Sequence, residues 1–226
     1  MKAVRLALAV ILVAGIPRAA AAQDAAARLD ARVSADVARA VQEIAHDAAE
    51  RGLPVEPLIQ KAIEGGAKRV PAERVIGAVR QLAARLDEAR SAERAAGLTA
   101  PQPDAIESGA YALNAGMTAQ QVSELVRVSQ PPYDPAVTLR VAATLTALGV
   151  PPAQGLATIE HLIAAGRPPS ELLDLPSEVQ RGTARGATPA EAAQQLDPQQ
   201  QGGAVVRGSG QRGHPTPQPP PHPHKP

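Results

Sequence analysis

The chain has 226 residues, with 23 basic and 22 acidic side chains, no cysteine and only two aromatic residues. Without cysteine, the sequence contains no disulfide and no thiol nucleophile. Because no region carries a dense basic patch, nucleic acid is not an expected partner.

Residues 1–22 have the pattern of a cleavable signal peptide. Lys2 and Arg5 precede an apolar run from Leu6 to Ile16, and small residues lead to a cleavage point between Ala22 and Gln23. The run is shorter than the roughly 18 apolar residues of a membrane span, and no later segment reaches that length. We therefore expect an exported bacterial protein, periplasmic or secreted, with no membrane span after the signal is removed.

Residues 23–197 have helical periodicity and no convincing strand, which predicts one all-α domain. The first helix is expected from Asp24 to Arg51, where Gly52 ends it, the second from Val55 to Glu64, and the third from Pro71 to Ala95. The apolar stripe of the first helix consists of Leu29, Val33, Val37, Val41, Ile44 and Ala48.

The segment between the second and third helices has two glycines followed by basic residues. A phosphate-binding loop needs a preceding strand and a Ser or Thr after the lysine, and this segment has neither. The pattern instead predicts a corner between two helices. Gly65 or Gly66 would take the left-handed conformation, and Pro71 would open the next helix. We therefore expect no nucleotide binding through Lys68.

One corner signature recurs along the chain: a glycine, one residue, then Pro or Thr. Thr118 with Gln121 and Thr188 with Glu191 add capping boxes, and Asp134 before a proline marks a further helix start. Short helices joined in this way predict stacked helical hairpins, with an irregular helical bundle as the alternative. The corner glycines are Gly52, Gly97, Gly116, Gly149, Gly166 and Gly186.

Residues 198–226 differ in composition from the rest, because Gln, Gly and Pro dominate and few apolar residues are present. This composition predicts a disordered tail with polyproline II character near its end. His214, His222 and His224 are weak candidates for a divalent metal. The tail has three basic residues and no acidic one, whereas Pro101–Asp197 has five basic and ten acidic residues.

Two further histidines lie in the predicted helical domain. Glu43 and His46 have the spacing of half a di-iron site, but no second such pair exists and both lie opposite the apolar stripe, which indicates a solvated face. His161 projects away from the apolar stripe of its helix and is expected to be a surface residue. Tyr133, in a proline-rich loop, is expected to pack against the core.

The segment IESGAYALNAG contains the one candidate for catalysis. Its Glu107-Ser108 and Asn114-Ala115-Gly116 resemble fragments of lytic transglycosylases, exported all-α enzymes that cut cell-wall glycan with one glutamic acid. In that family the two fragments lie far apart in sequence, whereas here they almost adjoin. The resemblance implies that Glu107 is a general acid, which requires a substrate cleft. A composition with so few aromatic residues argues against such a cleft.

The expected function is therefore a non-catalytic interaction or scaffold module of the bacterial envelope that binds other proteins. This expectation rests on architecture, because stacked hairpins present long surfaces. The alternative is a glycan-cleaving enzyme that uses Glu107. No cofactor motif is present, so no cofactor is expected.

Overall fold

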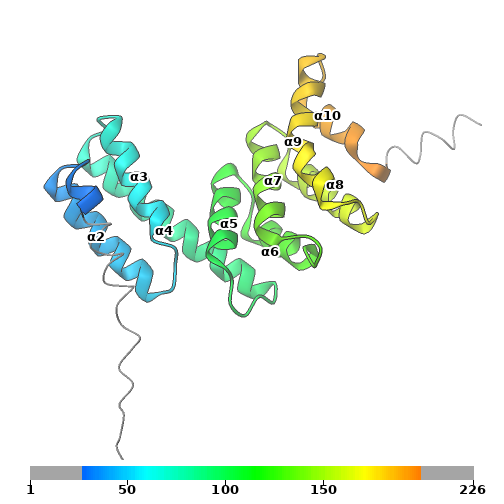
Figure 1. The fold of residues 1–226 in the computed structure, drawn as a ribbon. Coiled ribbons are helices and arrows are strands. Elements are labelled where there is room, and N and C mark those ends of the chain that lie inside the picture. The colour runs from blue at the N-terminus through cyan, green and yellow to red at the C-terminus, as the bar shows by residue number, and fades with distance from the viewer. Residues whose placement is uncertain (1–26, 200–226) are drawn as a thin grey trace, which may run out of the picture.

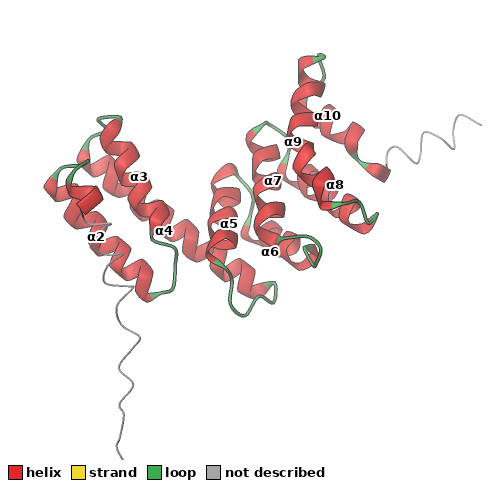
Figure 2. Cartoon of the chain, in the orientation of Figure 1, coloured by secondary structure: helices red, strands yellow, loops and turns green. Residues whose placement is uncertain are grey.

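The computed structural model describes residues 27–199, which are helical and contain no strand, as Figure 2 shows. The predicted all-α class is confirmed. The signal peptide with its Ala22–Gln23 cleavage point, the tail and its three histidines lie outside the described residues, apart from the first two tail positions. The helices are α2 (Ala35–Glu50), α3 (Glu56–Ala67), α4 (Ala72–Ala95), α5 (Pro103–Ala115), α6 (Ala119–Val128), α7 (Pro135–Ala147), α8 (Pro152–Ala164), α9 (Pro169–Ala184) and α10 (Pro189–Leu196).

The helices form an elongated stack, with α2 and α10 at opposite ends (Figure 1). The well-packed pairs of helices are neighbours or next neighbours along the chain. Helices α5, α7 and α9 follow one another in one layer, and α4, α6, α8 and α10 follow one another in the other. This succession is typical of stacked helical hairpins rather than of an irregular bundle. None of the helices within residues 27–199 combines the length and apolar character that a membrane crossing requires.

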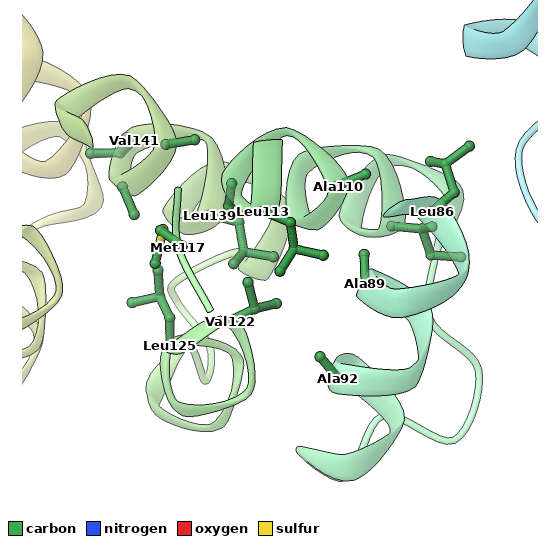
Figure 3. Packing of buried hydrophobic residues seen from close by; sticks show 14 of the residues in the cluster. Leu86, Ala89, Ala92, Ala110, Leu113, Met117, Val122, Leu125, Leu139 and Val141 are labelled. Carbon is green, nitrogen blue, oxygen red and sulfur yellow. The ribbon is translucent and has the colours of Figure 1, made fainter. Parts of the chain in front are cut away.

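The core is built from Leu, Val, Ile and Ala, which allows thin layers. Figure 3 shows its middle, where α4 residues face Ala110 and Leu113 of α5. A Cβ atom added at Gly109 of α5 would lie 3.0 Å from the Cβ of Ala89 on α4. Since real Cβ contacts are rarely that short, the glycine allows these two helices to approach closely.

The predicted corners are confirmed. All six corner glycines have positive φ, from 66° at Gly166 to 112° at Gly116. Such angles suit glycine because it has no Cβ to clash with the backbone. Both capping boxes are present, at Thr118 and Thr188, and the Asp134 side chain accepts hydrogen bonds from the backbone at the start of α7.

The corner between α3 and α4 exists, but the prediction of its left-handed residue is wrong. Gly65 and Gly66 lie inside α3, which runs to Ala67, and the residue with positive φ is Arg69, at 53°. The two glycines are needed for packing instead. A Cβ at Gly65 would lie 2.7 Å from Val75, and one at Gly66 would lie 2.6 Å from the Arg32 carbonyl oxygen.

The single first helix predicted from Asp24 to Arg51 is also wrong, because the chain turns over residues 31–34 and α2 begins after Ser34. Ser34 has the extended backbone of a residue that precedes a helix (φ −67°, ψ 155°). The apolar stripe continues across the break, with Leu29 buried and Val33 partly buried. Periodicity alone therefore did not reveal the turn.

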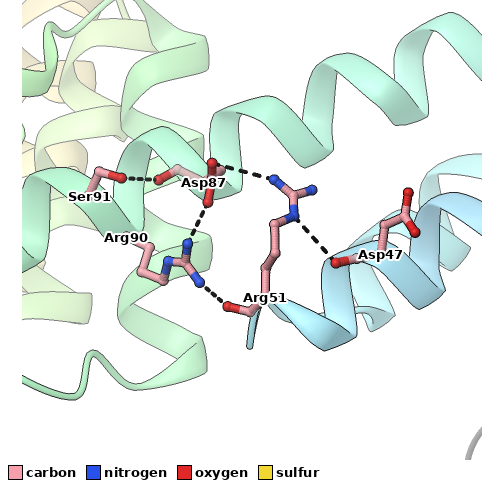
Figure 4. A network of polar contacts seen from close by, with 5 residues as sticks. All are labelled: Asp47, Arg51, Asp87, Arg90 and Ser91. Carbon is pink, nitrogen blue, oxygen red and sulfur yellow. Dashed lines mark hydrogen bonds and ion pairs between the residues drawn. The ribbon is translucent and has the colours of Figure 1, made fainter.

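A polar network connects the end of α2 to the middle of α4 (Figure 4). The guanidinium of Arg51 lies 3.4 Å from a carboxylate oxygen of Asp87. Asp87 also accepts a 2.6 Å hydrogen bond from Arg90, which donates in addition to the Arg51 carbonyl oxygen. The long helix α4 thus belongs both to the N-terminal cluster of α2 and α3 and to the stack that follows.

Candidate functional site

Two adjoining hollows lie along the layer formed by α5, α7 and α9. The first, which we call the Tyr111 hollow, has a volume of about 810 Å³ and is lined by residues of α3, α4, α5 and α7. The second, the Leu173 hollow, has a volume of about 850 Å³ and is lined by α5, α7, α9 and the segment before α5. Arg140 and Thr144 of α7 line both hollows. We call the two hollows together the groove.

Each hollow contains one exposed apolar side chain. Among residues 27–199, the large hydrophobic residues that are exposed are Tyr111, at 46%, and Leu173, at 60%. A single exposed apolar residue needs no explanation, but here both lie in the groove. The groove therefore combines concave shape with the large apolar groups that binding surfaces use.

The amphipathic pattern of α5 places its polar face in the Tyr111 hollow. Ile106, Ala110 and Leu113, spaced on one face of the helix, are buried, at 2%, 1% and 4% exposure. Residues at positions i, i+4 and i+7 lie on one face of a helix. Glu107, Tyr111 and Asn114 have this spacing, and all three line the hollow.

The Glu107 carboxyl group is half-buried, and its pKa is raised above the ordinary value. Burial is the largest cause, and the negative charges of Asp104 and Glu56 act in the same direction, whereas Arg140 opposes them. Glu107 thus lines a hollow, although the composition argued against a substrate cleft with aromatic walls. Its position among Tyr111 and Asn114 could not be read from composition.

Arg140 lies where the two hollows meet. Its guanidinium donates a hydrogen bond to the Ser108 hydroxyl oxygen at 3.2 Å. Within residues 27–199, no carboxylate forms an ion pair with it at 4.0 Å or less. By contrast, Lys61 and Arg85, which also line the Tyr111 hollow, pair with Glu64 and Glu88. Arg140 is thus a cation available to a ligand in the groove.

Several groove residues were missed by sequence reasoning. Arg140 and Thr144 are far from Glu107 in sequence, and Leu173 belongs to another helix again. One usable signal was present: Tyr111 and Leu173 are large apolar residues on faces that the helical period assigns to solvent. Such exceptions to the amphipathic pattern are where a binding surface is expected.

The other candidate residues do not join the groove. Glu43 and His46 are exposed, as predicted, and no cluster of potential metal ligands occurs among the residues that the structure describes. His161 is more buried than predicted, with 33% of its side chain exposed, because its Nδ1 lies 2.9 Å from both carboxylate oxygens of Asp197. This contact holds α8 to the end of α10. Tyr133 packs against the core as expected and donates a hydrogen bond to the Arg167 carbonyl oxygen.

Glu93 is a second glutamic acid in an unusual environment, away from the groove lining. Its side chain is fully buried in α4, and neither carboxyl oxygen has a hydrogen-bond partner among the described residues. Burial raises its pKa to about 7. The group is therefore partly neutral near physiological pH.

No protein-family model, curated protein or solved structure matches this chain.

Proposed function

We propose that the chain is an exported, non-catalytic interaction module that binds an extended segment of a partner protein along the groove. The observation that carries this proposal is the placement of Tyr111 and Leu173, the exposed large hydrophobic residues of the described part, in two adjoining hollows. Apolar anchors in concave sites supply most of the binding energy at protein interfaces, and tyrosine is among the commonest anchors.

The shape of the groove favours an extended segment over a small molecule. The hollows share Arg140 and Thr144 of α7, and their linings extend from α3 and α4 across α5 and α7 to α9, so a ligand that fills both must run across several helices. An extended chain of a few residues has this form, and its carbonyl groups or carboxylates would accept hydrogen bonds from Arg140. The export pattern of residues 1–22 supports a partner in the periplasm or outside the cell.

Site-specific photocrosslinking tests this proposal. A photoreactive amino acid replaces Tyr111 or Leu173 in the full chain, and the exposed Gln120 on α6 serves as the control position. We expect one and the same envelope protein to be crosslinked at both groove positions and not at Gln120. Equal crosslinking at all three positions, or none in the groove, would contradict the proposal.

A substitution at Leu173 tests whether this side chain contributes to binding or only lies near the partner. With the photoreactive group at Tyr111, the Leu173→Ala change should reduce the yield of the crosslinked partner about ten-fold, since a central apolar anchor contributes more than about 1 kcal/mol. Because Leu173 is 60% exposed, the change should leave the fold stable. Circular dichroism provides that control.

A second function, glycan cleavage by Glu107, has one specific observation in its favour. Glu107 lines the Tyr111 hollow, and burial raises its pKa, as a general acid requires. In that reaction the carboxylic acid would donate its proton to the glycosidic oxygen. The test compares wild type and Glu107→Gln on purified cell wall. Under the interaction proposal the wild type releases no glycan, whereas release that disappears in Glu107→Gln would establish the enzyme instead.

A further inference from the structure

We infer that the groove is occupied by the chain's own C-terminal segment, residues 200–226, so that a partner must displace this segment to bind. The inference rests on the proposed function of the groove, and it names a regulation of that same site. The occupant lies outside the described residues. It is identified by its charge, by its proline content and by the place where it joins the stack.

The charge of the segment is complementary to the half of the molecule that carries most of the groove. Pro101–Asp197, which contains α5 to α10, has ten acidic and five basic residues, whereas residues 200–226 have Arg207, Arg212 and Lys225 and no acid. Residues 27–100 are nearly balanced, with 12 basic and 11 acidic residues. Electrostatic attraction therefore directs the segment toward the α5–α10 half rather than toward α2 and α3.

The Leu173 hollow shows the same complementarity locally. Its lining includes the carboxylates of Asp104 and Asp134 and one cation, Arg140. Asp134 accepts hydrogen bonds from the backbone of α7, while Asp104 is exposed in the first turn of α5. Asp104 is thus the carboxylate that is most open to Arg207 or Arg212.

The connection to the stack places the segment within reach of both hollows. It begins beyond α10, which packs on α9, and α9 supplies Leu173 and Pro176 to the groove. The segment leaves beside α8, because Asp197 contacts His161 there. Packed helices lie roughly 10 Å apart, so the path from that point across to the other layer and along α9 and α7 to α5 is about 40 Å. An extended chain spans about 3.1 Å per residue, so the dozen residues up to Arg212 cover about 40 Å. Residues 215–226 then reach the Tyr111 hollow.

The prolines at the end of the segment suit the exposed aromatic side chain of the Tyr111 hollow. Residues 215–226 are rich in proline. Proline-rich chains are extended before they bind, lose little conformational entropy on binding, and dock against exposed aromatic side chains. Tyr111, 46% exposed, offers such a side chain. The segment thus has its two arginines first, toward the Leu173 hollow, and its prolines last, with Lys225 among them, toward the Tyr111 hollow.

Paramagnetic relaxation in the full chain tests the inference. The sequence has no cysteine, so Thr216→Cys accepts a single nitroxide label, and the reduced label provides the reference spectrum. We expect the amide signals of Tyr111 and Asn114 in α5 to be broadened, and those of α2 to be unaffected. Broadening that is no stronger in α5 than in α2 would overturn the inference.

Two further measurements complete this test: one on a charge variant, and one on a mixture of isotope-labelled and nitroxide-bearing protein. Asp104→Asn should reduce the broadening about two-fold, which is what one exposed ion pair contributes, while the matched Asp36→Asn in the first turn of α2 should not. Isotope-labelled protein mixed with unlabelled, nitroxide-bearing protein should show no broadening. Broadening in the mixture would mean that the occupant is a second copy and would overturn the inference.

The two proposals fail separately. If the nitroxide leaves α5 unaffected while Tyr111 and Leu173 still crosslink a partner, the self-occupied groove is wrong and the interaction function stands. If the segment occupies the groove and no partner crosslinks even in the Arg207→Ser/Arg212→Ser variant, the interaction function is wrong. If both hold, this variant should increase the partner crosslink about five-fold, because it removes both arginines that are attracted to Asp104 and to the acidic half of the stack.

Discussion

At the scale of single residues, the pKa of a carboxyl group depends on how deeply the group is buried and on the charges around it. Glu93 and Glu107 are both glutamic acids with raised pKa values, and burial is the largest cause for each. Glu107 has solvent on one side and charged neighbours, whereas Glu93 is fully buried, with Gly109 of α5 next to its carboxyl oxygen. The first lines the groove, and the second affects stability.

The stability of the protein should depend on pH through Glu93. The carboxyl group titrates near 4.5 when unfolded and at about 7 when folded. Below pH 4.5 it is protonated in both states. As the pH rises from 4.5 to 7, the unfolded state loses its proton first, so the contribution of this group to the free energy of unfolding decreases, and it levels off above pH 7.

The Glu93→Gln variant tests this dependence, because the amide has the same shape and does not titrate. Its free energy of unfolding should exceed that of the wild type at pH 8, and the difference should shrink toward pH 4. Urea unfolding across this range measures both proteins, with Glu43→Gln on the exposed face of α2 as the control. A constant difference between Glu93→Gln and the wild type at every pH would show that Glu93 is not the titrating group.

At the scale of helices, glycines have two different roles in this chain. Those at the six corners adopt positive φ and end helices. Others lie inside helices, where a missing Cβ allows close contact: a Cβ added at Gly182 of α9 would lie 2.6 Å from the Cβ of Ala192 on α10. Gly77 in α4 has neither role, because nothing lies within 4 Å of the Cβ it would carry.

This contrast predicts opposite effects for two identical substitutions. Gly66→Ala should destabilise the protein, because its Cβ would meet the Arg32 carbonyl oxygen at 2.6 Å and the backbone turn before α2 would have to move. Gly77→Ala should stabilise it by up to about 1 kcal/mol, since alanine favours helix over glycine. Urea midpoints of the two variants measure the difference. Stabilisation by both would show that α3 does not pack tightly against that turn.

At the scale of the whole molecule, the core is one apolar layer that runs along the stack, and packed helices are neighbours or next neighbours. Stability in such arrays is a sum of local units and their interfaces, so the ends open more readily than the middle. The C-terminal end is held by the contact of His161 with Asp197 and by the close approach of α9 and α10.

Hydrogen exchange should follow this order. Amide hydrogens of α10 should exchange faster than those of α5 and α7 in the wild type. Leu113→Ala removes a buried side chain in mid-stack, where a loss of about 2 to 5 kcal/mol is expected, and should accelerate exchange in α4 and α7 as well as in α5. Mass spectrometry of the exchanged protein measures each helix. Equal rates along the chain would indicate one cooperative unit instead of a stack.

Export is a property of the whole chain that only its sequence predicts. If residues 1–22 act as a signal, protein isolated from the envelope or medium of a bacterial host should begin at or near Gln23. N-terminal sequencing provides the measurement. Recovery of the chain from the cytoplasm with Met1 intact would be incompatible with the proposed location and with an envelope partner.

Local interactions explain what the sequence by itself determined. Helix periodicity, capping boxes and corner glycines depend on residues within about four positions of one another, so the all-α class, the corners from Gly52 to Gly186 and the buried face of α5 could be predicted. The turn before α2 was missed because the apolar stripe runs through it unchanged.

Only the tertiary structure decided the features that join distant residues. Gly66 meets Arg32, Arg140 bonds to Ser108 and His161 pairs with Asp197, each across about thirty or more positions. The groove depends on the same kind of assembly, because Tyr111, Arg140 and Leu173 belong to three different helices. Burial and charge neighbours, and with them the pKa values of Glu93 and Glu107, exist only after the helices have stacked.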